Sequence, residues 1–365
     1  SSMKKKIANF LSVLLVISMF VGCSSNKSKD TDTTNQPVQN EQKVENKQEN
    51  KKVEEDLGSV VIYTPHNAEE VNPVVKEFQE RTGIRVDVVA AGTGELLKRI
   101  EAESNNPLGD VMWGGGAESL DSFKEYFDSY VIEDDDKIPT HFKDKEYLWY
   151  GFSALPMVII YNKKLVKPEE APTSWEDLLD EKWKGKIAYA DPARSGSSYT
   201  TLVTLLTAHK DEGDEGWDFV KKFIGSLDGK LISSSSGVYK GVADGEYSVG
   251  LTLEKAAMRY IKAGANIEMV YPEDGTSAAP DGIALIKGAK NIENAKKFIE
   301  FSFGKDVQNF AAKEFNWRST RTDIDSPEGL GPMEEIKLVD YDFSWAANNK
   351  EAVLDRWKSI LTGQE

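Results

Sequence analysis

The sequence contains a single cysteine, Cys23, among its 365 residues. One cysteine cannot form a disulfide within the chain, and it cannot supply the grouped cysteines of a zinc or iron–sulfur centre. The fold must therefore be stabilised by its hydrophobic core, without structural disulfides and without a cysteine metal site.

A block of basic residues is also lacking. The formal net charge is −16, and it becomes −19 when the lysines at positions 4–6 are discounted as part of a leader. A strongly acidic chain repels polyanions, so nucleic acid and anionic membrane surfaces are poor partners. We therefore expect no nucleic-acid partner, and membrane contact only through a lipid anchor.

No apolar run reaches the roughly 20 residues that a membrane-spanning helix needs. The apolar run 7–21 follows three lysines and predicts a signal peptide over residues 1–22, in which the two serines before Met3 are interpreted as a cloning remnant. The run ends at Gly22-Cys23-Ser24, which resembles the lipobox of bacterial lipoproteins and predicts lipidation of Cys23. The alternative is a free thiol at the signal-peptide boundary.

The segment after the cysteine is almost devoid of apolar side chains, so ordering it would bring no compensating burial. We interpret residues 23–57 as the lipidated cysteine followed by a disordered tether. The alternative is a charged helix over residues 41–56, which would be polar on every face. The remaining residues, 58–365, are numerous enough for two lobes with cores of their own.

The first part of this remainder alternates between strand and helix patterns. Strands are predicted over residues 60–63, 84–89 and 110–113, and helices with apolar spacing over residues 69–82 and 95–104. This order predicts an α/β lobe with a parallel sheet, and in such sheets ligands bind at the carboxyl ends of the strands. The loops expected there are residues 64–67, 91–94 and 114–116.

The second part repeats the pattern and then returns to the first. Strands are predicted over residues 157–161, 186–189, 247–252 and 282–286, and helices over residues 198–209, 217–224 and 292–303. Two crossings between the lobes would form a hinge that closes on a ligand. The predicted lobes are residues 58–155 with about 275–325, and residues 156–274 with C-terminal helices over about 326–365.

Several short motifs follow one another along the mature chain. In chain order they are Tyr161-Asn162, Trp175-Glu176-Asp177-Leu178, Trp183-Lys184-Gly185-Lys186-Ile187, Asp191-Pro192, Gly288-Ala289-Lys290-Asn291 and Ala295-Lys296-Lys297-Phe298. Together they resemble the ferric-iron, polyamine and phosphonate branch of the type II solute-binding proteins of ABC transporters. The resemblance implies a two-lobe fold with a hinge and an interlobe ligand cleft.

The resemblance also implies a function. We expect a monomeric solute-binding lipoprotein on the outer face of the cytoplasmic membrane, with an ABC permease and an ATPase as separate chains. It would be neither an enzyme nor a cofactor protein. Two other classes stay open, namely a surface esterase, for which a base such as His66 would need a neighbouring acid, and an adhesin or scaffold lipoprotein.

The cargo must be chosen among the ligands of the branch. Ferric-binding members ligate through adjacent tyrosines after the strand that here ends at Gly250, and this chain reads Leu251-Thr252-Leu253-Glu254-Lys255-Ala256 at that place. His66 lies where some iron binders keep a histidine, but one imidazole cannot replace several anionic oxygen ligands. We therefore predict no metal site and a phosphonate or organophosphate cargo, such as 2-aminoethylphosphonate. Ferric iron, polyamines and thiamine are the alternatives.

The loop that follows Asp191 is rich in serine and precedes a helix. Hydroxyls, free backbone N–H groups and the positive end of the helix dipole would suit an oxyanion there. The alternative is that Ser197 or Ser198 merely caps the helix and Gly196 makes a turn. The predicted contacts in this loop are Arg194, Ser195, Gly196, Ser197, Ser198 and Tyr199.

Two acids, Asp281 and Glu254, are predicted to hold an ammonium group or sugar hydroxyls, unless they are solvated loop carboxylates. Trp113 would be a wall of the site or a buried residue, and Arg318 and Arg321 are expected to pair with surface acids. The serines at 233–236 are interpreted as a hinge or strand-edge loop. The remaining predicted contacts are His66, Asn67, Gly92, Thr93, Gly114, Gly115, Ser153 and Thr252.

Overall fold

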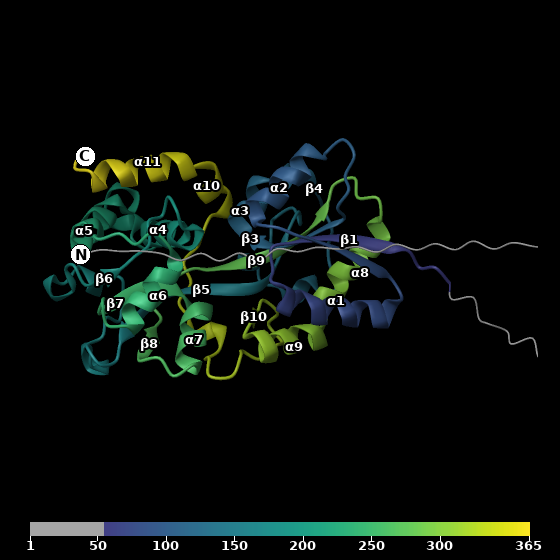
Figure 1. Ribbon diagram of the computed structural model, residues 1–365. Coiled ribbons are helices and arrows are strands. Elements are labelled where there is room, and N and C mark those ends of the chain that lie inside the picture. The colour runs from purple at the N-terminus through teal and green to yellow at the C-terminus, as the bar shows by residue number, and fades with distance from the viewer. Residues whose placement is uncertain (1–54) are drawn as a thin grey trace, which may run out of the picture. The chain divides into compact units, whose positions relative to one another are not determined.

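Ten strands form one mixed sheet network in the computed structural model, which describes residues 55–365 (Figure 1). The main path of neighbouring strands is β2-β1-β3-β9-β5-β7-β6, and β4, β8 and β10 pair with strands of that path. The predicted signal peptide, the lipidation of Cys23 and most of the predicted tether lie outside the described residues.

The first three strands are parallel, as predicted. Val60 of β1 lies opposite Val86 of β2, and Ile62 of β1 lies opposite Val111 of β3. Helices α1 and α2 follow β1 and β2 because their apolar side chains recur at helical spacing and are buried on one face. These elements are β1 (Ser59–Thr64), α1 (Ala68–Thr82), β2 (Arg85–Ala90), α2 (Thr93–Ala102) and β3 (Val111–Gly116).

Two long strands carry the chain between the halves of the sheet (Figure 1). The first half of β5 (Tyr150–Asn162) pairs with β9 (Ala278–Ile286), and its second half pairs with β7 (Val249–Leu253) and β8 (Ile267–Val270). The sequence predicted only residues 157–161 and 282–286 of these strands. Both predicted strands begin late because Gly151 and Pro156 in β5, and Pro280 in β9, disfavour strand interiors, yet all three residues are accommodated here.

The other elements surround these crossing strands. Helix α6 begins after Ser234, whose hydroxyl accepts a hydrogen bond from the amide of Gly237. The predicted hinge loop over 233–236 is therefore the start of a helix. The elements are α3 (Ala117–Ser122), β4 (Phe127–Asp128), β6 (Ile187–Ala188), α4 (Gly196–Ala208), α5 (Trp217–Leu227), α6 (Ser235–Ala243), α7 (Glu254–Lys262), α8 (Ile292–Ser302), α9 (Lys305–Phe315), β10 (Arg318–Ser319), α10 (Phe343–Asn348) and α11 (Lys350–Leu361).

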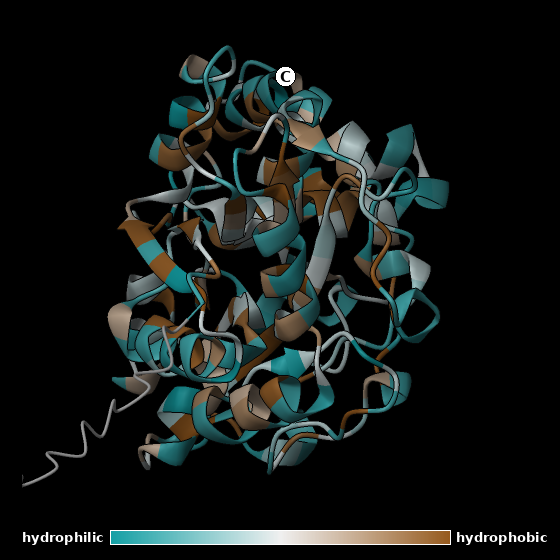
Figure 2. Ribbon diagram, turned by 90° about the vertical axis from the view of Figure 1, so that its right-hand side faces the viewer, coloured by the Kyte–Doolittle hydropathy of each residue, from teal (hydrophilic) through white to brown (hydrophobic). Residues whose placement is uncertain are grey.

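Buried side chains gather in separate clusters on the two sides of the crossing strands. One cluster contains Trp113 and Phe298, and another contains Trp175 together with Trp357 of the C-terminal helix α11. Figure 2 shows hydrophobic residues mainly along the central strands and hydrophilic residues on the helices and loops around them. The lobe boundaries given above stay a prediction, although the packing of α11 against α5 places the C-terminus beside the second cluster.

Close packing of the crossing strands makes one glycine sensitive to substitution. A Cβ on Gly151 would lie 2.4 Å from Cβ of Pro280 and 2.9 Å from the carbonyl oxygen of Phe142. We expect Gly151→Ala to lower the free energy of unfolding by about 1–3 kcal/mol, measured by urea denaturation. Gly225→Ala is the control, because a Cβ there meets nothing within 4 Å and alanine favours the helix interior. Equal stability of the two variants would contradict the predicted steric conflict.

Candidate functional site

A cavity of about 250 Å³ lies between the end of β3, the start of α4 and the two crossing strands. Its volume is slightly below the roughly 300–1,000 Å³ of typical drug-sized sites, so it suits a small solute. The residues that line it come from β3 and α3, β5, α4, β7, β9 and α11. They are Gly116, Ala117, Glu118, Ser119, Leu155, Met157, Gly196, Ser197, Tyr199, Thr200, Leu253, Ala279, Pro280 and Lys350.

The start of α4 presents polar groups to this cavity. The Ser198 amide donates to the hydroxyl of Ser195 at 3.3 Å, so Ser195 is the N-cap rather than Ser197 or Ser198. The hydroxyl of Ser197 lies 3.1 Å from that of Ser195. The amides of Gly196 and Ser197 belong to the first turn, where a helix supplies no backbone acceptor. The cap therefore leaves an N-terminus suited to an anion facing the cavity.

Two charged side chains of opposite sign complete the lining. The Thr200 hydroxyl lies 3.3 Å from Oε1 of Glu118, which joins α4 to α3. Burial raises the pKa of Glu118 to about 7, against the lowering effects of Thr200 and of the Lys350 ammonium. Lys350 is exposed, and its Nζ lies 5.2 Å from the ring centre of Tyr199. Sequence reasoning missed Glu118 and Lys350, because no local pattern distinguishes them, and it placed Thr200 in the serine-rich loop without naming it as a contact.

The C-terminal helices hold Lys350 in this position. The Ser344 hydroxyl of α10 donates to Asp121 of α3 at 2.8 Å, and the Tyr199 hydroxyl donates to the Ala346 carbonyl. Helix α10 is thus tied both to the helix that carries Glu118 and to α4. Tyr199 has a structural role in addition to lining the cavity.

The predicted contacts near strands β1 and β3 do not belong to the lining of the cavity. Nε2 of His66 would lie 2.9 Å from a Cβ on Gly114, whose φ of +115° strains any other residue. Burial, and secondarily the charge of Lys255, lowers the pKa of His66 to about 4, so the imidazole is neutral at pH 7. Trp113 is 2% exposed and packs its ring against His66 and Phe298. Trp113 is therefore a buried residue.

The other predicted residues of this region have identifiable local roles. Asn67 caps α1, because its side-chain oxygen accepts a hydrogen bond of 3.1 Å from the amide of Glu70. Thr93, which follows Gly92 at the start of α2, would lie 2.8 Å from a Cβ on Gly115, so this glycine allows the close approach of α2 to β3. Arg194 is exposed and does not line the cavity.

A second polar group joins α7 to α1. Nζ of Lys255 lies 3.5 Å from Oε1 of Glu70 and 5.3 Å from the ring centre of Trp317. Burial raises the pKa of Asp281 to about 6, with Lys255 opposing the shift and Glu70 adding to it. Asp281 lies opposite Ser153 of β5 and Gly116 of β3 in the sheet. The two predicted contacts Asp281 and Ser153 therefore adjoin the lining residue Gly116 without lining the cavity themselves.

Glu254 does not face the cavity, contrary to its predicted role as a ligand acid. Its carboxylate accepts two hydrogen bonds from Arg318, at 3.0 and 2.9 Å, and one from the hydroxyl of Tyr271. Both ionised side chains are buried, and the segment 251–256 is the end of β7 and the start of α7 rather than a loop. Thr252 is buried within β7, opposite Val158 of β5.

The predicted pairing of the two arginines with acids is found, with one difference. Arg321 bonds to Asp323 at 2.9 Å and to Asp134 at 2.8 Å, and these acids are at least partly exposed. The partner of Arg318 is the buried Glu254 instead of a surface acid. Neither arginine is free to bind an anion in this arrangement.

Comparison with known proteins assigns this chain to a family. Residues 113–344 match the model of the family described as bacterial extracellular solute-binding protein. The chain belongs to this family. The family is described as one of solute-binding proteins, so the solute-binding family that the sequence motifs predicted is confirmed.

Individual relatives of this solute-binding protein cover most of its length. Iron uptake protein A1 of Synechocystis is 29% identical over 69% of the chain and 73% of that protein. A putative 2-aminoethylphosphonate-binding periplasmic protein of Salmonella typhimurium is 27% identical over 79% of the chain and 86% of that protein. The structure of the periplasmic binding protein AfuA from Actinobacillus pleuropneumoniae, with fructose-6-phosphate bound, matches with a TM-score of 0.70 and 27% identity, over 84% and 99% of the two chains. The type II periplasmic-binding-protein fold is confirmed.

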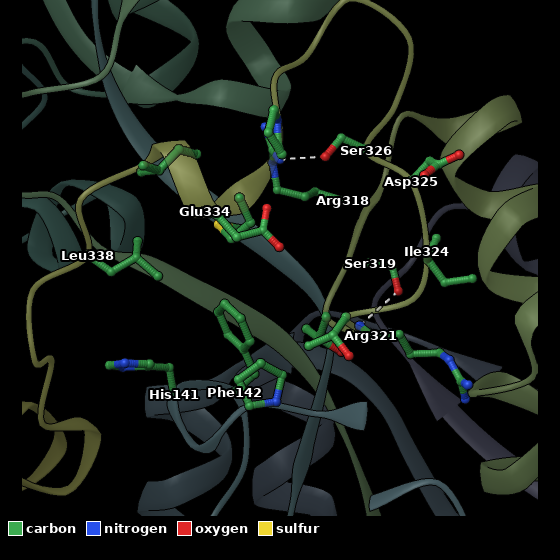
Figure 3. A pocket seen from close by; sticks show the side chains of 16 residues that line it. His141, Phe142, Arg318, Ser319, Arg321, Ile324, Asp325, Ser326, Glu334 and Leu338 are labelled. Carbon is green, nitrogen blue, oxygen red and sulfur yellow. Dashed lines mark hydrogen bonds between the residues drawn. The ribbon is translucent and has the colours of Figure 1, made fainter. Parts of the chain in front are cut away.

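Another cavity of this solute-binding protein, about 430 Å³, lies beside β10 and the segment after it (Figure 3). Its lining includes Arg318 and Arg321, but the guanidinium groups are held by Glu254, Ser326, Asp134 and Asp323. Figure 3 shows the bond from Arg318 to Ser326. With both arginines engaged, this cavity offers less to a charged solute than the one at α4.

Within residues 55–365, no group of three or more histidine, aspartate or glutamate side chains is arranged to hold a metal ion. None of the helices described there has the length and apolarity required to cross a membrane.

Proposed function

We propose that this solute-binding protein delivers a small organic phosphate or phosphonate to an ABC importer. The observation that carries the proposal is the start of α4, where Ser197 and two first-turn amides face a cavity that Lys350 also lines. Hydroxyls, amide donors and an ammonium group form charge-assisted hydrogen bonds with a tetrahedral oxyanion. The permease and the ATPase are separate chains in this proposal.

The size of the cavity supports a cargo with few atoms beyond its anionic group. Leu155, Met157 and Pro280 add apolar surface to the lining of the cavity. An alkyl phosphonate or a short organic phosphate can place its carbon chain against that surface. The relatives named for 2-aminoethylphosphonate and crystallised with fructose-6-phosphate support the same ligand class.

Ferric iron is the competing cargo, since one relative is an iron uptake protein. A hard trivalent cation needs several anionic oxygen ligands. In the described chain, the carboxylate of Glu254 is held by Arg318, and the cavity lining contains one carboxylate, that of Glu118. This donor set favours an anionic organic cargo over a bare metal ion.

Cys23 and the leader support a further part of the proposal. A lipid on Cys23 would hold the protein at the outer face of the cytoplasmic membrane, with residues 24–57 as a tether. Globomycin treatment of producing cells, which blocks processing of lipoprotein precursors, is expected to leave the uncleaved precursor. Unchanged processing would contradict the lipid anchor without affecting the cargo assignment.

A thermal-melting screen of the full chain tests the cargo. A ligand present at about a hundredfold its Kd stabilises the protein by about 2.7 kcal/mol, which raises the melting temperature by several degrees. We expect such shifts with 2-aminoethylphosphonate, glycerol phosphate or a hexose phosphate, and none with spermidine or thiamine. Equimolar sulfate controls for general anion effects. A shift with ferric citrate alone, accompanied by a visible charge-transfer band, would show that the cargo is iron.

A further inference from the structure

The cavity contains an acid whose charge is poorly balanced. Glu118 is the carboxylate and Lys350 the ammonium among the fourteen residues that line it. The Thr200 hydroxyl has a single proton and is shared between Glu118 at 3.3 Å and the carbonyl oxygen of Gly196 at 3.1 Å. The carboxylate is therefore held by one long and shared hydrogen bond. A half-buried carboxylate with so few hydrogen-bond partners favours a cationic group beside it.

The start of α4 and the carboxylate of Glu118 are close enough together to bind the two charged groups of one short zwitterionic ligand. Thr200 lies four residues, slightly more than one turn or about 6 Å, along α4 from Gly196. Glu118 contacts Thr200, whereas the anion-binding amides belong to Gly196 and Ser197. An anion at the helix start and a cation at Glu118 would therefore be separated by roughly one helical turn.

We infer that Glu118 recognises an ammonium group on the cargo, so that the cargo is a zwitterionic aminoalkyl phosphonate or phosphate rather than a sugar phosphate. This inference rests on the proposed function, because it takes the anionic end of the ligand to lie at the start of α4. The raised pKa of Glu118 agrees with it, since a ligand ammonium would stabilise the ionised carboxylate that burial disfavours.

The two acids predicted from the sequence are less suited to this role. Glu254 is neutralised by Arg318 and does not line the cavity. Asp281 has the ammonium of Lys255 as a nearby charge, and it adjoins the cavity without lining it. Glu118 differs from both acids because it lines the cavity itself, where burial raises its pKa and the ammonium of Lys350 opposes that rise without forming an ion pair within 4 Å among the described residues.

Calorimetric titration of the full chain with two matched probes tests the inference. 2-Aminoethylphosphonate and ethylphosphonate share the anionic end and differ in the amine. We expect the wild-type protein to bind the amine-bearing probe at least about tenfold more tightly, as for one charge-assisted hydrogen bond. In Glu118→Gln this preference is expected to disappear, while the affinity for ethylphosphonate changes by less than about threefold.

Two further variants keep the test independent of folding. Glu125→Gln, on the exposed turn after α3, is expected to leave both affinities unchanged. Glu118→Asp keeps the charge and is expected to retain part of the preference, so it serves if the glutamine variant does not fold. Melting curves without ligand report the folding of each variant.

The outcomes separate the inference from the proposed function. Equal binding of the two probes by the wild-type protein, or a preference that persists in Glu118→Gln, overturns the role of Glu118 and leaves the anion site in place. Failure of both probes and of glycerol phosphate to bind overturns the proposed function, and the inference with it.

Discussion

Replacing Arg318 with methionine is expected to lower the free energy of unfolding by about 3–5 kcal/mol, because the change leaves the carboxylate of Glu254 buried without its cationic partner. The guanidinium makes two hydrogen bonds to that carboxylate and two more to Ser326 and the Gly331 carbonyl. The side chains of the pair are only 2% and 3% exposed, so water cannot replace the lost partner. Urea denaturation followed by circular dichroism measures the effect.

Matched variants separate the buried charge from the loss of a side chain. Arg85→Met removes an exposed pair with Asp56 and is expected to cost less than about 1 kcal/mol. Adding Glu254→Gln to Arg318→Met is expected to recover much of the loss, because no unpaired charge then remains buried. A loss below 1 kcal/mol for Arg318→Met alone would mean that Glu254 finds another partner or is protonated at little cost.

Replacing Ser197 with aspartate is expected to weaken phosphonate and phosphate binding by more than a hundredfold. The new carboxylate would lie at the start of α4, where the proposal places the anion. Two like charges 4 Å apart repel by about 4 kcal/mol at an effective dielectric constant of 20. Because aspartate in the first turn of a helix is otherwise favourable, the protein itself should stay folded. Calorimetric titration with 2-aminoethylphosphonate measures the loss.

The chain contains a matched control for this substitution. Helix α6 begins with the same arrangement as α4, since Ser234 caps it and the hydroxyls of Ser234 and Ser236 lie 3.0 Å apart. Ser236 does not line the cavity. Ser236→Asp is therefore expected to leave binding unchanged while making the same chemical change at a helix start. Equal binding by both aspartate variants would place the anion elsewhere than at α4.

Strands β1 to β3 and helices α1 and α2 were predicted well because their signals are local. The apolar spacing that leads to α1 and the β-branched run of β1 each arise from neighbours in the chain. The long crossing strands were predicted only in part, because Gly151 and Pro156 interrupt the pattern and the pairing that stabilises them comes from residues more than a hundred positions away.

Of the cavity lining, the start of α4 was predicted from the sequence and the other elements were not. Serines before a helix give the same local signal of an anion-binding helix N-terminus wherever they occur. In α4 this N-terminus lines the cavity. The serines that precede α6 carry the same local signal outside it. Local sequence could not distinguish the two, since the difference is what lies opposite each helix.

The sequence by itself determined the α/β class, the family motifs and the polar start of α4, because these depend on hydrophobic periodicity and on the chemistry of adjacent residues. Only the tertiary structure decided which charges meet. It pairs Glu254 with Arg318 and places Glu118 and Lys350 in the lining of the same cavity. The partner of a charged side chain is set by the packing of distant segments, and burial then determines how strongly each charge acts.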